Sequence, residues 1–320
     1  MLTKKDKNGV ERDIVLGYDN ASYYRTCLIL IPLGLSCSYI AAVDPGHPVY
    51  NAIPGRYVNR IGNGTFTLDN VTYHTAHNDG PNTLHSGPNN WSFRVWNITD
   101  VTKNSITYTI YDPANSTNMP GRVEATVTYS LSKNKWNIVI DAISPEVRTP
   151  IMLTQHTYFQ LDAFANPTNR TIWNHTIHMP YAKRVMEIDG NALPTGVISK
   201  IPKGAIDDFW SQPRKLGFAA NQPGFEGHCG GNGACHGYNT NWAFDKKENK
   251  DVVVTLSSEW SGIKADLRTN QEAIVLYTCN WNDGKTEFKS TQGVKGQDKF
   301  IPRDGCIAIE AQDYVDGINQ

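Results

Sequence analysis

Four short segments of this chain concentrate polar side chains that could bind or transform a small polar molecule. They span Gly55–Ile61, Asn78–Gly87, Leu153–Phe159 and Ile309–Tyr314. Their histidines, glutamate, arginine and amides are the groups that general acid–base catalysis and hydrogen bonding to hydroxyls require. The segments lie far apart in the sequence, so only the fold could bring any of them together.

Within these segments, the candidate functional side chains are those of His156, Glu310, Asn59, Arg60 and His85. Each also has a structural interpretation. A histidine in an apolar strand is more often a satisfied core residue than a catalyst, and a glutamate in a strand can face solvent. The histidines show no HxH or HExxH spacing and the cysteines no paired CxxC set, so we expect no metal site.

Composition places the chain among globular proteins rich in strands. Its 320 residues are 39% hydrophobic and 19% charged, with a formal net charge of −1. The chain shows no basic stripe, so we expect no nucleic acid partner. Abundant Asn, Thr, Ser, Gly and Tyr favour strands and turns over helices.

Alternation of apolar and polar residues is the dominant pattern and predicts strands. Val123–Leu131 and Trp136–Ala142 alternate on either side of Ser132-Lys133-Asn134, which predicts an antiparallel hairpin. Gln212–His236 is glycine-rich and predicts a long loop. No stretch has sustained helical periodicity, so we predict an all-β sandwich in one domain. Other predicted strands are Thr65–His74, Ser105–Asp112, Leu153–Leu161, Val252–Ser257, Ile263–Arg268, Ala273–Trp281 and Cys306–Ala311.

Three features bear on the cellular compartment. Cys229 and Cys235 flank a glycine-rich turn, and either a disulfide or two free thiols would fit there. Composition alone would give roughly four Asn-x-Ser/Thr sequons, whereas the chain has more, which favours a secreted glycoprotein over a cytoplasmic one. The polar N-terminus is not typical of a signal peptide. The sequons begin at Asn20, Asn63, Asn70, Asn90, Asn97, Asn115, Asn169 and Asn174.

An uncharged stretch near the N-terminus, Thr26–Val43, is at the short limit for a membrane span. Pro32 and Gly34 lie near its middle and disfavour a continuous helix. We therefore do not expect a membrane partner.

The polar segments resemble motifs of the galactose mutarotase (aldose 1-epimerase) family, and of its secreted fungal members in particular. The matching stretches are IPGRYVNRIGNGTFTLDNVTYH, NDGPNTLHSG, PIMLTQHTYFQL, LPTGVI and IEAQDYVDGINQ, in the family's order. The resemblance implies one domain over residues 1–320. The implied fold is a large twisted antiparallel β-sandwich, galactose mutarotase-like, with an open sugar-binding cleft.

The resemblance also implies site residues and a reaction. His156 in TQHTYF matches the family's acid and Glu310 in IEAQDY its base, while His85, Arg60 and the adjacent Asn59 match the sugar-binding motifs. A carboxylate and an imidazolium on opposite sides of the anomeric carbon could open and reclose the ring of a free aldose. The substrate would be a monosaccharide such as galactose or glucose, with no cofactor and no metal.

The chain departs from the family pattern in three places. Asn239 in GYNTNWAFD stands where the family has a sugar-binding aspartate, so an amide replaces a charge at that position. The apolar stretch at about 25–43 interrupts a place where the family has a short connection. The chain also begins later and ends earlier than the pattern, so we expect strands at both ends to be missing.

Other functions remain open on the sequence alone. A carbohydrate-binding module with weak or no turnover would fit the loss of the aspartate at Asn239. A hexose-6-phosphate 1-epimerase would require extra basic residues for the phosphate, and no such cluster lies near the motifs. A glycosidase would need two carboxylates across the scissile bond, and only Glu310 is placed by a motif.

Overall fold

A computed structural model describes residues 2–19, 49–230, 235–245 and 248–320. In these residues every sheet is built from antiparallel strands, and the helical segments are short 3₁₀ turns. No helix of the described part is long and apolar enough to cross a membrane. The apolar stretch at 25–43, with Cys27, Cys37 and the Asn20 sequon, lies outside the described residues.

The chain forms two compact units, and each is described by itself. Unit 1 comprises residues 1–19 and 155–314, and unit 2 comprises residues 20–154 and 315–320. Both units are therefore built from segments distant in sequence. The expectation of one domain over residues 1–320 stays a prediction.

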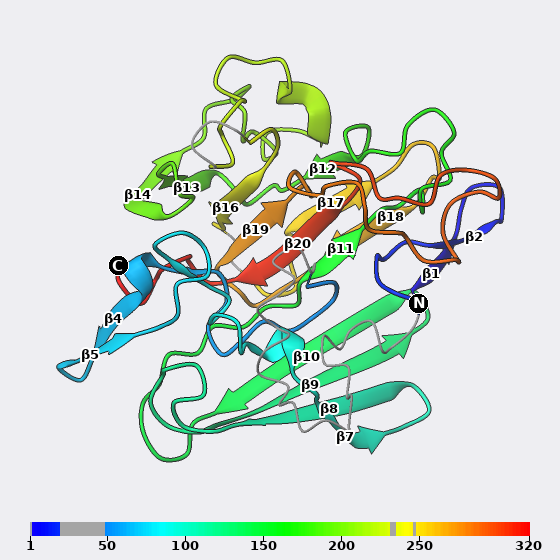
Figure 1. Cartoon of the computed structure of the whole chain (residues 1–320). Helices are drawn as coiled ribbons and strands as arrows, with labels where there is room; N and C mark the ends of the chain where they lie inside the picture. Colours follow the sequence, from blue (N-terminus) through cyan, green and yellow to red (C-terminus); the bar gives the residue numbers. More distant parts are fainter. Residues whose placement is uncertain (1, 20–48, 231–234, 246–247) are drawn as a thin grey trace. The chain divides into compact units, whose positions relative to one another are not determined.

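Unit 1 contains two large sheets (Figure 1). The six-stranded sheet runs in the order β11 (Thr157–Phe159), β20 (Ile307–Gln312), β19 (Ala273–Tyr277), β16 (Asn239–Ala243), β13 (Arg184–Ile188) and β14 (Pro194–Lys200). The four-stranded sheet runs in the order β15 (Arg214–Lys215), β12 (Thr176–His178), β17 (Val254–Ser257) and β18 (Lys264–Leu267). A small hairpin joins β1 (Thr3–Lys5) to β2 (Glu11–Asp13), and a 3₁₀ turn spans Leu216–Ala219.

The two sheets of unit 1 share one hydrophobic core. Trp242, Leu276 and Ile309 contribute from the six-stranded sheet, and Ile177 and Leu256 from the four-stranded sheet. Because side chains alternate along a strand, these residues occupy one face of each sheet. The sheets therefore form a sandwich, and the other face of the six-stranded sheet is left for residues of a different kind.

Unit 2 contains a four-stranded sheet in the order β10 (Lys135–Ile143), β9 (Val123–Ser132), β8 (Ser105–Asp112) and β7 (Asn97–Val101). Two further sheets have two strands each: β3 (Arg60–Ile61) pairs with β6 (Thr83–Leu84), and β4 (Thr65–Leu68) forms a hairpin with β5 (Val71–His74). Further 3₁₀ turns span Gly62–Gly64 and Trp91–Phe93. Fully buried in this unit, Arg56 donates from Nε to Asp112 at 2.8 Å, and its Nη1 bonds the carbonyl oxygens of Pro120 and Gly121.

The strongest alternation predicts the structure well. The β9–β10 hairpin is confirmed, with Ser132 opposite Lys135 across the turn, and the inward residues of both strands pack in one cluster. The strand predicted at Ser105–Asp112 is confirmed without change. The single strand predicted over Thr65–His74 is wrong, because Asp69 and Asn70 adopt positive φ values of 51° and 63° and turn the chain into a hairpin.

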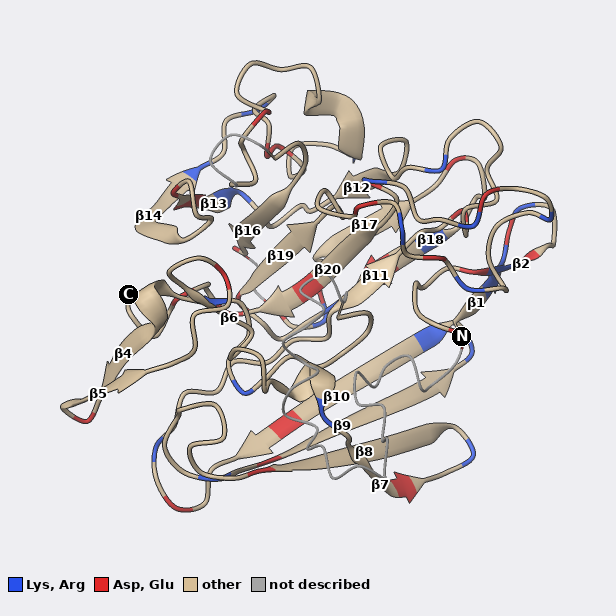
Figure 2. Ribbon diagram, in the orientation of Figure 1, with Lys and Arg blue, Asp and Glu red and all other residues tan. Residues whose placement is uncertain are grey.

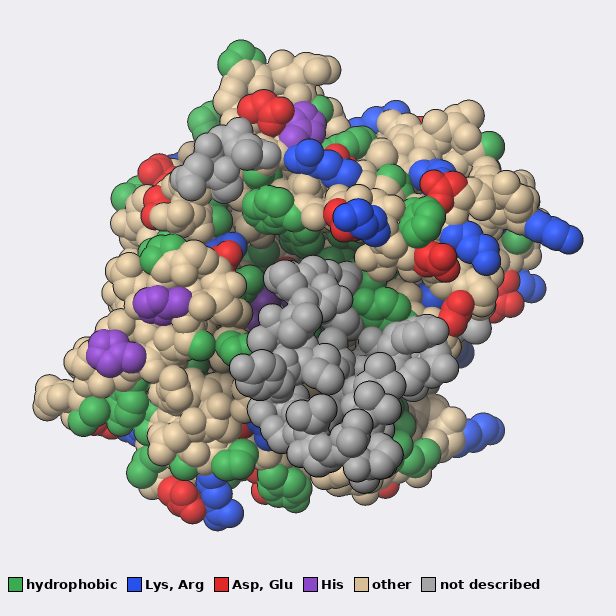
Figure 3. Space-filling view, viewed as in Figure 1, with side chains coloured by type: hydrophobic (Ala, Val, Ile, Leu, Met, Phe, Trp, Pro, Cys, Tyr) green, Lys and Arg blue, Asp and Glu red, His purple; other side chains and the backbone are tan. Residues whose placement is uncertain are grey.

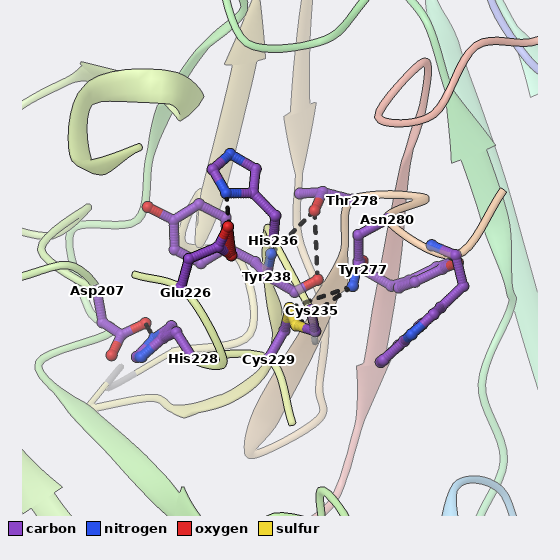
Figure 4. Close-up of a disulfide and its surroundings, with 11 residues drawn as sticks. Asp207, Glu226, His228, Cys229, Cys235, His236, Tyr238, Tyr277, Thr278 and Asn280 are labelled. Atoms are coloured by element: carbon purple, nitrogen blue, oxygen red, sulfur yellow. Dashed lines mark hydrogen bonds and ion pairs between the residues drawn. A yellow bond between two sulfur atoms is a disulfide. The ribbon is translucent and has the colours of Figure 1, made fainter. Parts of the chain in front are cut away.

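Two disulfides brace one end of the six-stranded sheet. Cys229 pairs with Cys235, which decides the choice left open by the sequence, and Cys279 pairs with Cys306, which the sequence did not predict. Nδ2 of the buried Asn280 lies 3.2 Å from Sγ of Cys229 and 3.6 Å from Sγ of Cys235 (Figure 4). Asn280 therefore connects the two disulfides beside the ends of β19 and β20.

The sequons differ in their exposure. Asn90 is buried, and its side chain donates to Gly87 and accepts from the backbone of Ser92, so it has no room for a glycan. Asn169 is half-buried. Glycosylation and secretion stay predictions, and the sequons on exposed asparagines are those at Asn63, Asn70, Asn97, Asn115 and Asn174.

The two disulfides should differ in their contribution to stability because they close loops of different length. The sequence separation is 27 for Cys279–Cys306 and 6 for Cys229–Cys235. In the chain-entropy model these loops correspond to about 3.5 and about 2 kcal/mol of unfolding free energy. We expect replacement of both cysteines by serine to destabilise more at the 279–306 pair, as measured by urea unfolding without reductant. The reverse order would contradict this account.

Candidate active site

The face of the six-stranded sheet that is turned away from the core carries a row of polar residues. Asn241 on β16 is opposite Val275 on β19, and Val275 is opposite Glu310 on β20. Thr157 on β11 is opposite Ile309, so His156, one residue earlier, falls beside Glu310. Residues directly opposite in a ladder point to the same side of the sheet. His156, Glu310, Val275 and Asn241 therefore share one face.

His156 and Glu310, both predicted to be catalytic, are in direct contact. Nε2 of His156 lies 3.3 Å from Oε1 of Glu310, and the two residues are only 4% and 2% exposed. The contact therefore places an imidazole nitrogen against a carboxylate oxygen where both groups are almost wholly shielded from water. Figure 2 shows β20, the strand that carries Glu310, between β19 and β11.

Aromatic rings line the same face one step further along the strands. The ring of His156 stacks on Tyr158 at a centroid distance of 4.8 Å, and Tyr158 meets the edge of Tyr277 at 6.3 Å. Tyr277 stacks in turn on Trp281 at 5.8 Å, and Trp281 is 48% exposed. Burial raises the pKa of Tyr277 to about 12, with the nearby charges of Asp304 and Glu310 adding to the shift. Tyr277 thus remains a neutral hydroxyl near neutral pH.

Asn239, where the resemblance implies an aspartate, lies on this same face. It is opposite Tyr277 in the ladder and half-buried. Alternation places Asn239 and Asn241 on one side of β16, with Thr240 on the core side between them. The structure therefore brings His156, Glu310 and Asn239, all predicted site residues, onto one face within unit 1.

Asn59, Arg60 and His85, also predicted to belong to the site, form a cluster within unit 2. The backbone amide of Asn59 donates to Nδ1 of His85 at 3.1 Å, and the side-chain oxygen of Asn59 accepts from the backbone of Arg60 at 3.0 Å. Nε of Arg60 donates to Asp79 at 2.7 Å. The pairing of β3 with β6, in which Arg60 is opposite Leu84, sets these positions. Their assignment to sugar binding stays a prediction.

The protonation of His85 follows from these contacts. Burial lowers its pKa to about 3, and the charge of Arg60 adds to the shift. His85 is therefore neutral near pH 7, and because Nδ1 accepts from Asn59, the proton is on Nε2. His85 can offer a neutral N–H donor and contributes no charge.

Sequence reasoning missed three residues of these clusters. Asp79 lies in the motif NDGPN and holds Arg60, but nothing in the motif names its partner. Tyr277 and Asn241 lie on strands that carry the site. If NTNWA is read as a strand, period-two alternation places Asn241 on the same face as Asn239. Asparagine disfavours strands, so the sequence did not predict this one.

Charges outside these clusters do not form a single-sign surface on the face drawn in Figure 3, where basic and acidic side chains of the described residues are interspersed. Among the described residues, no group of three or more His, Cys, Asp or Glu side chains could hold a metal ion.

Comparison with known proteins now assigns the family. The family model described as aldose 1-epimerase matches residues 37–319. This chain belongs to the aldose 1-epimerase family. It is 30% identical over 353 residues to a probable aldose 1-epimerase of Arthroderma benhamiae, covering 99% of this chain and 74% of that protein. It is 27% identical over 319 residues to galactose mutarotase of Sus scrofa, covering 100% of this chain and 80% of that protein.

Solved structures confirm the all-β fold of this aldose 1-epimerase family member. An aldose epimerase homologue from C. elegans has a TM-score of 0.78 at 24% identity, covering 99% of this chain and 83% of that one. Galactose 1-epimerase from Lactobacillus acidophilus has a TM-score of 0.69 at 19% identity, covering 99% and 81%. At these identities the likeness concerns the fold, and the roles of the site residues remain to be argued from this chain.

Asp304, which lies near Tyr277, is a buried acid whose charge destabilises the fold. Burial raises its pKa to about 6, against the opposing effects of Arg303 and His236. The unfolded chain thus loses its proton first, so stability falls as pH rises from about 4 to about 6 and stays lower above that. Asp304 has a φ of 57°, which asparagine tolerates well.

We therefore expect Asp304→Asn to raise the unfolding free energy at pH 8 by about 1–3 kcal/mol, with little change at pH 4. Urea unfolding at both pH values measures the difference. Asp141→Asn, at an exposed strand position, is the matched control and should change neither value. An equal effect of Asp304→Asn at the two pH values would contradict the assignment.

Proposed function

We propose that this chain is an aldose 1-epimerase that interconverts the α and β anomers of free aldoses such as galactose or glucose. The observation that carries the proposal is the buried contact between His156 and Glu310, 3.3 Å apart. It supplies an acid and a base side by side within a family of aldose 1-epimerases. Both protons that must move in the reaction belong to oxygens bonded to the same carbon, so an adjacent pair suits the chemistry and need not lie on opposite sides of the anomeric carbon.

In the proposed reaction, Glu310 removes the proton from O1 while His156 donates a proton to the ring oxygen. The C1–O5 bond breaks, C1 becomes an aldehyde, and rotation about C1–C2 presents its other face to O5. The ring then closes, with O5 returning its proton to His156 and O1 recovering one from Glu310. Atoms and charge balance without a further reactant, and the pair ends in its starting protonation state.

A second candidate function has one observation in its favour. Asn239 in place of a family aspartate would suit a sugar-binding module without turnover. That candidate does not explain why a histidine and a glutamate are buried against each other, an arrangement that is costly to maintain. We therefore favour the enzyme, and the same assay distinguishes the two.

Loss of either member of the pair should abolish acceleration. We expect Glu310→Gln and His156→Gln each to lower kcat for mutarotation of fresh α-D-glucose or α-D-galactose by about 10²–10⁴-fold, because each removes one proton transfer. Polarimetry, corrected for the spontaneous rate, measures this effect.

Glu259→Gln is the matched control, since Glu259 is an exposed carboxylate in the same unit and should keep the wild-type rate. Sugar binding by the wild-type protein without acceleration would instead identify a binding module.

Restoring a carboxylate at position 239 should strengthen substrate binding. An ionised acceptor makes stronger hydrogen bonds to hydroxyls than an amide oxygen does, and Asn239 is on the face that carries Glu310. We expect Asn239→Asp to lower KM by about three- to tenfold. Asn239→Ala should raise KM. Unchanged KM in both variants would show that position 239 does not contact the sugar.

A further inference from the structure

The side chain of Asn241 is buried but makes no hydrogen bond with any described residue. Asn241 is 3% exposed, and neither its Oδ1 nor its Nδ2 has a partner there. Buried amides in native proteins nearly always have partners, and those that do not require an explanation. A ligand that donates to the oxygen and accepts from the nitrogen would provide one, and a sugar hydroxyl can do both.

The position of Asn241 points to the substrate of the acid–base pair. Asn241, Val275 and Glu310 lie in one row of the ladder, across adjacent strands. Val275 between them has no polar atom, so the amide is the next polar group in the row after the carboxylate. Adjacent strands are about 4.8 Å apart, and β16 is two strand spacings from β20. The Cα atoms of Asn241 and Glu310 are therefore separated by about 10 Å.

Thr240, the preceding residue on β16, offers a comparison, because it has a buried polar atom without a partner on the opposite face of the sheet. It is also 3% exposed, and its Oγ1 has no described partner. It is opposite Leu276 and therefore faces the hydrophobic core. Asn241 and Thr240 share strand, burial and lack of a partner, and they differ in the face to which they point.

We propose that Asn241 is a substrate-binding, specificity-determining residue whose amide hydrogen-bonds a ring hydroxyl remote from C1. The inference rests on the proposed epimerase activity. With Glu310 at O1, a side chain two strands away reaches the C3–C4 side of a pyranose. Glucose and galactose differ in configuration at C4, so Asn241 acts on the preference between them.

Asn241→Leu tests the proposal, because leucine has a similar volume and no polar atoms. We expect kcat/KM for α-D-glucose to fall by about 10- to 100-fold, mainly through KM, while the thermal unfolding temperature is unchanged or raised. The matched control is Thr240→Val, which also removes a buried unpaired polar atom. It should preserve or raise the unfolding temperature and leave kcat/KM unchanged.

Deoxy sugars identify the hydroxyl. For 3-deoxy- or 4-deoxy-glucose, the loss caused by Asn241→Leu should largely disappear, whereas it should persist for 2-deoxy-glucose. A lowered unfolding temperature with unchanged kcat/KM would show a structural role and overturn the proposal. Equal losses on all three deoxy sugars would overturn it as well.

Failure of the proposed function gives a different result. A wild-type protein that accelerates no aldose fails as an epimerase. The inference on Asn241 is then judged by binding: glucose or galactose must raise the unfolding temperature of the wild type and of Thr240→Val. Asn241→Leu must lose that rise, and a rise that it keeps would overturn the inference.

Discussion

A carboxylate held almost wholly out of water is the constraint on which the candidate site depends. Glu310 is 2% exposed in the middle of β20, with β11 on one side and β19 on the other. Its backbone is fixed in two ladders, so the side chain cannot reach water by a small movement of the strand. The electrostatic cost of the charge must be offset locally, and His156 at 3.3 Å is one group placed to do so.

The alternation of side chains along the strands links this pair to the stability of the fold. Alternation along β19 and β20 places Leu276 and Ile309 in the hydrophobic core. It therefore places Val275 and Glu310 on the opposite face of the sheet. A one-residue shift in register would bury Glu310 in the core and expose apolar side chains. Precise register is therefore a requirement of both folding and chemistry. The Cys279–Cys306 disulfide, which joins the end of β19 to the start of β20, opposes such a shift.

The sequence predicted much of this arrangement, and its failures have identifiable physical causes. Long alternating strands such as β8, β9 and β10 were predictable from the sequence, because the residues that pack inward there also have a high strand propensity. The motif resemblance named His156 and Glu310, but their contact depends on pairing between strands some 150 residues apart, which no local pattern encodes. β16 was missed because its polar-face positions are asparagines, which disfavour strands, although Trp242 of the same strand packs in the core. The Cys279–Cys306 pairing was missed because the pairing of β19 with β20 brings the two cysteines together, and no local pattern encodes that pairing.

Asn239 stands on β16 where the family resemblance implies an aspartate, and this amide changes the electrostatics of the polar face. A carboxylate at position 239 would lie on the same side of the sheet as Glu310, and like charges in a poorly solvated setting disfavour ionisation of either group. Asn239 and Asn241 provide hydrogen-bonding capacity on this face without a second charge beside Glu310. Under the proposed function, an amide at position 239 forgoes charge-assisted hydrogen bonds to hydroxyls and adds no repulsion to the proposed base. A charge on this face of β16 would therefore strengthen the binding of hydroxyls and at the same time increase the repulsion on Glu310. Two neutral amides keep both effects small.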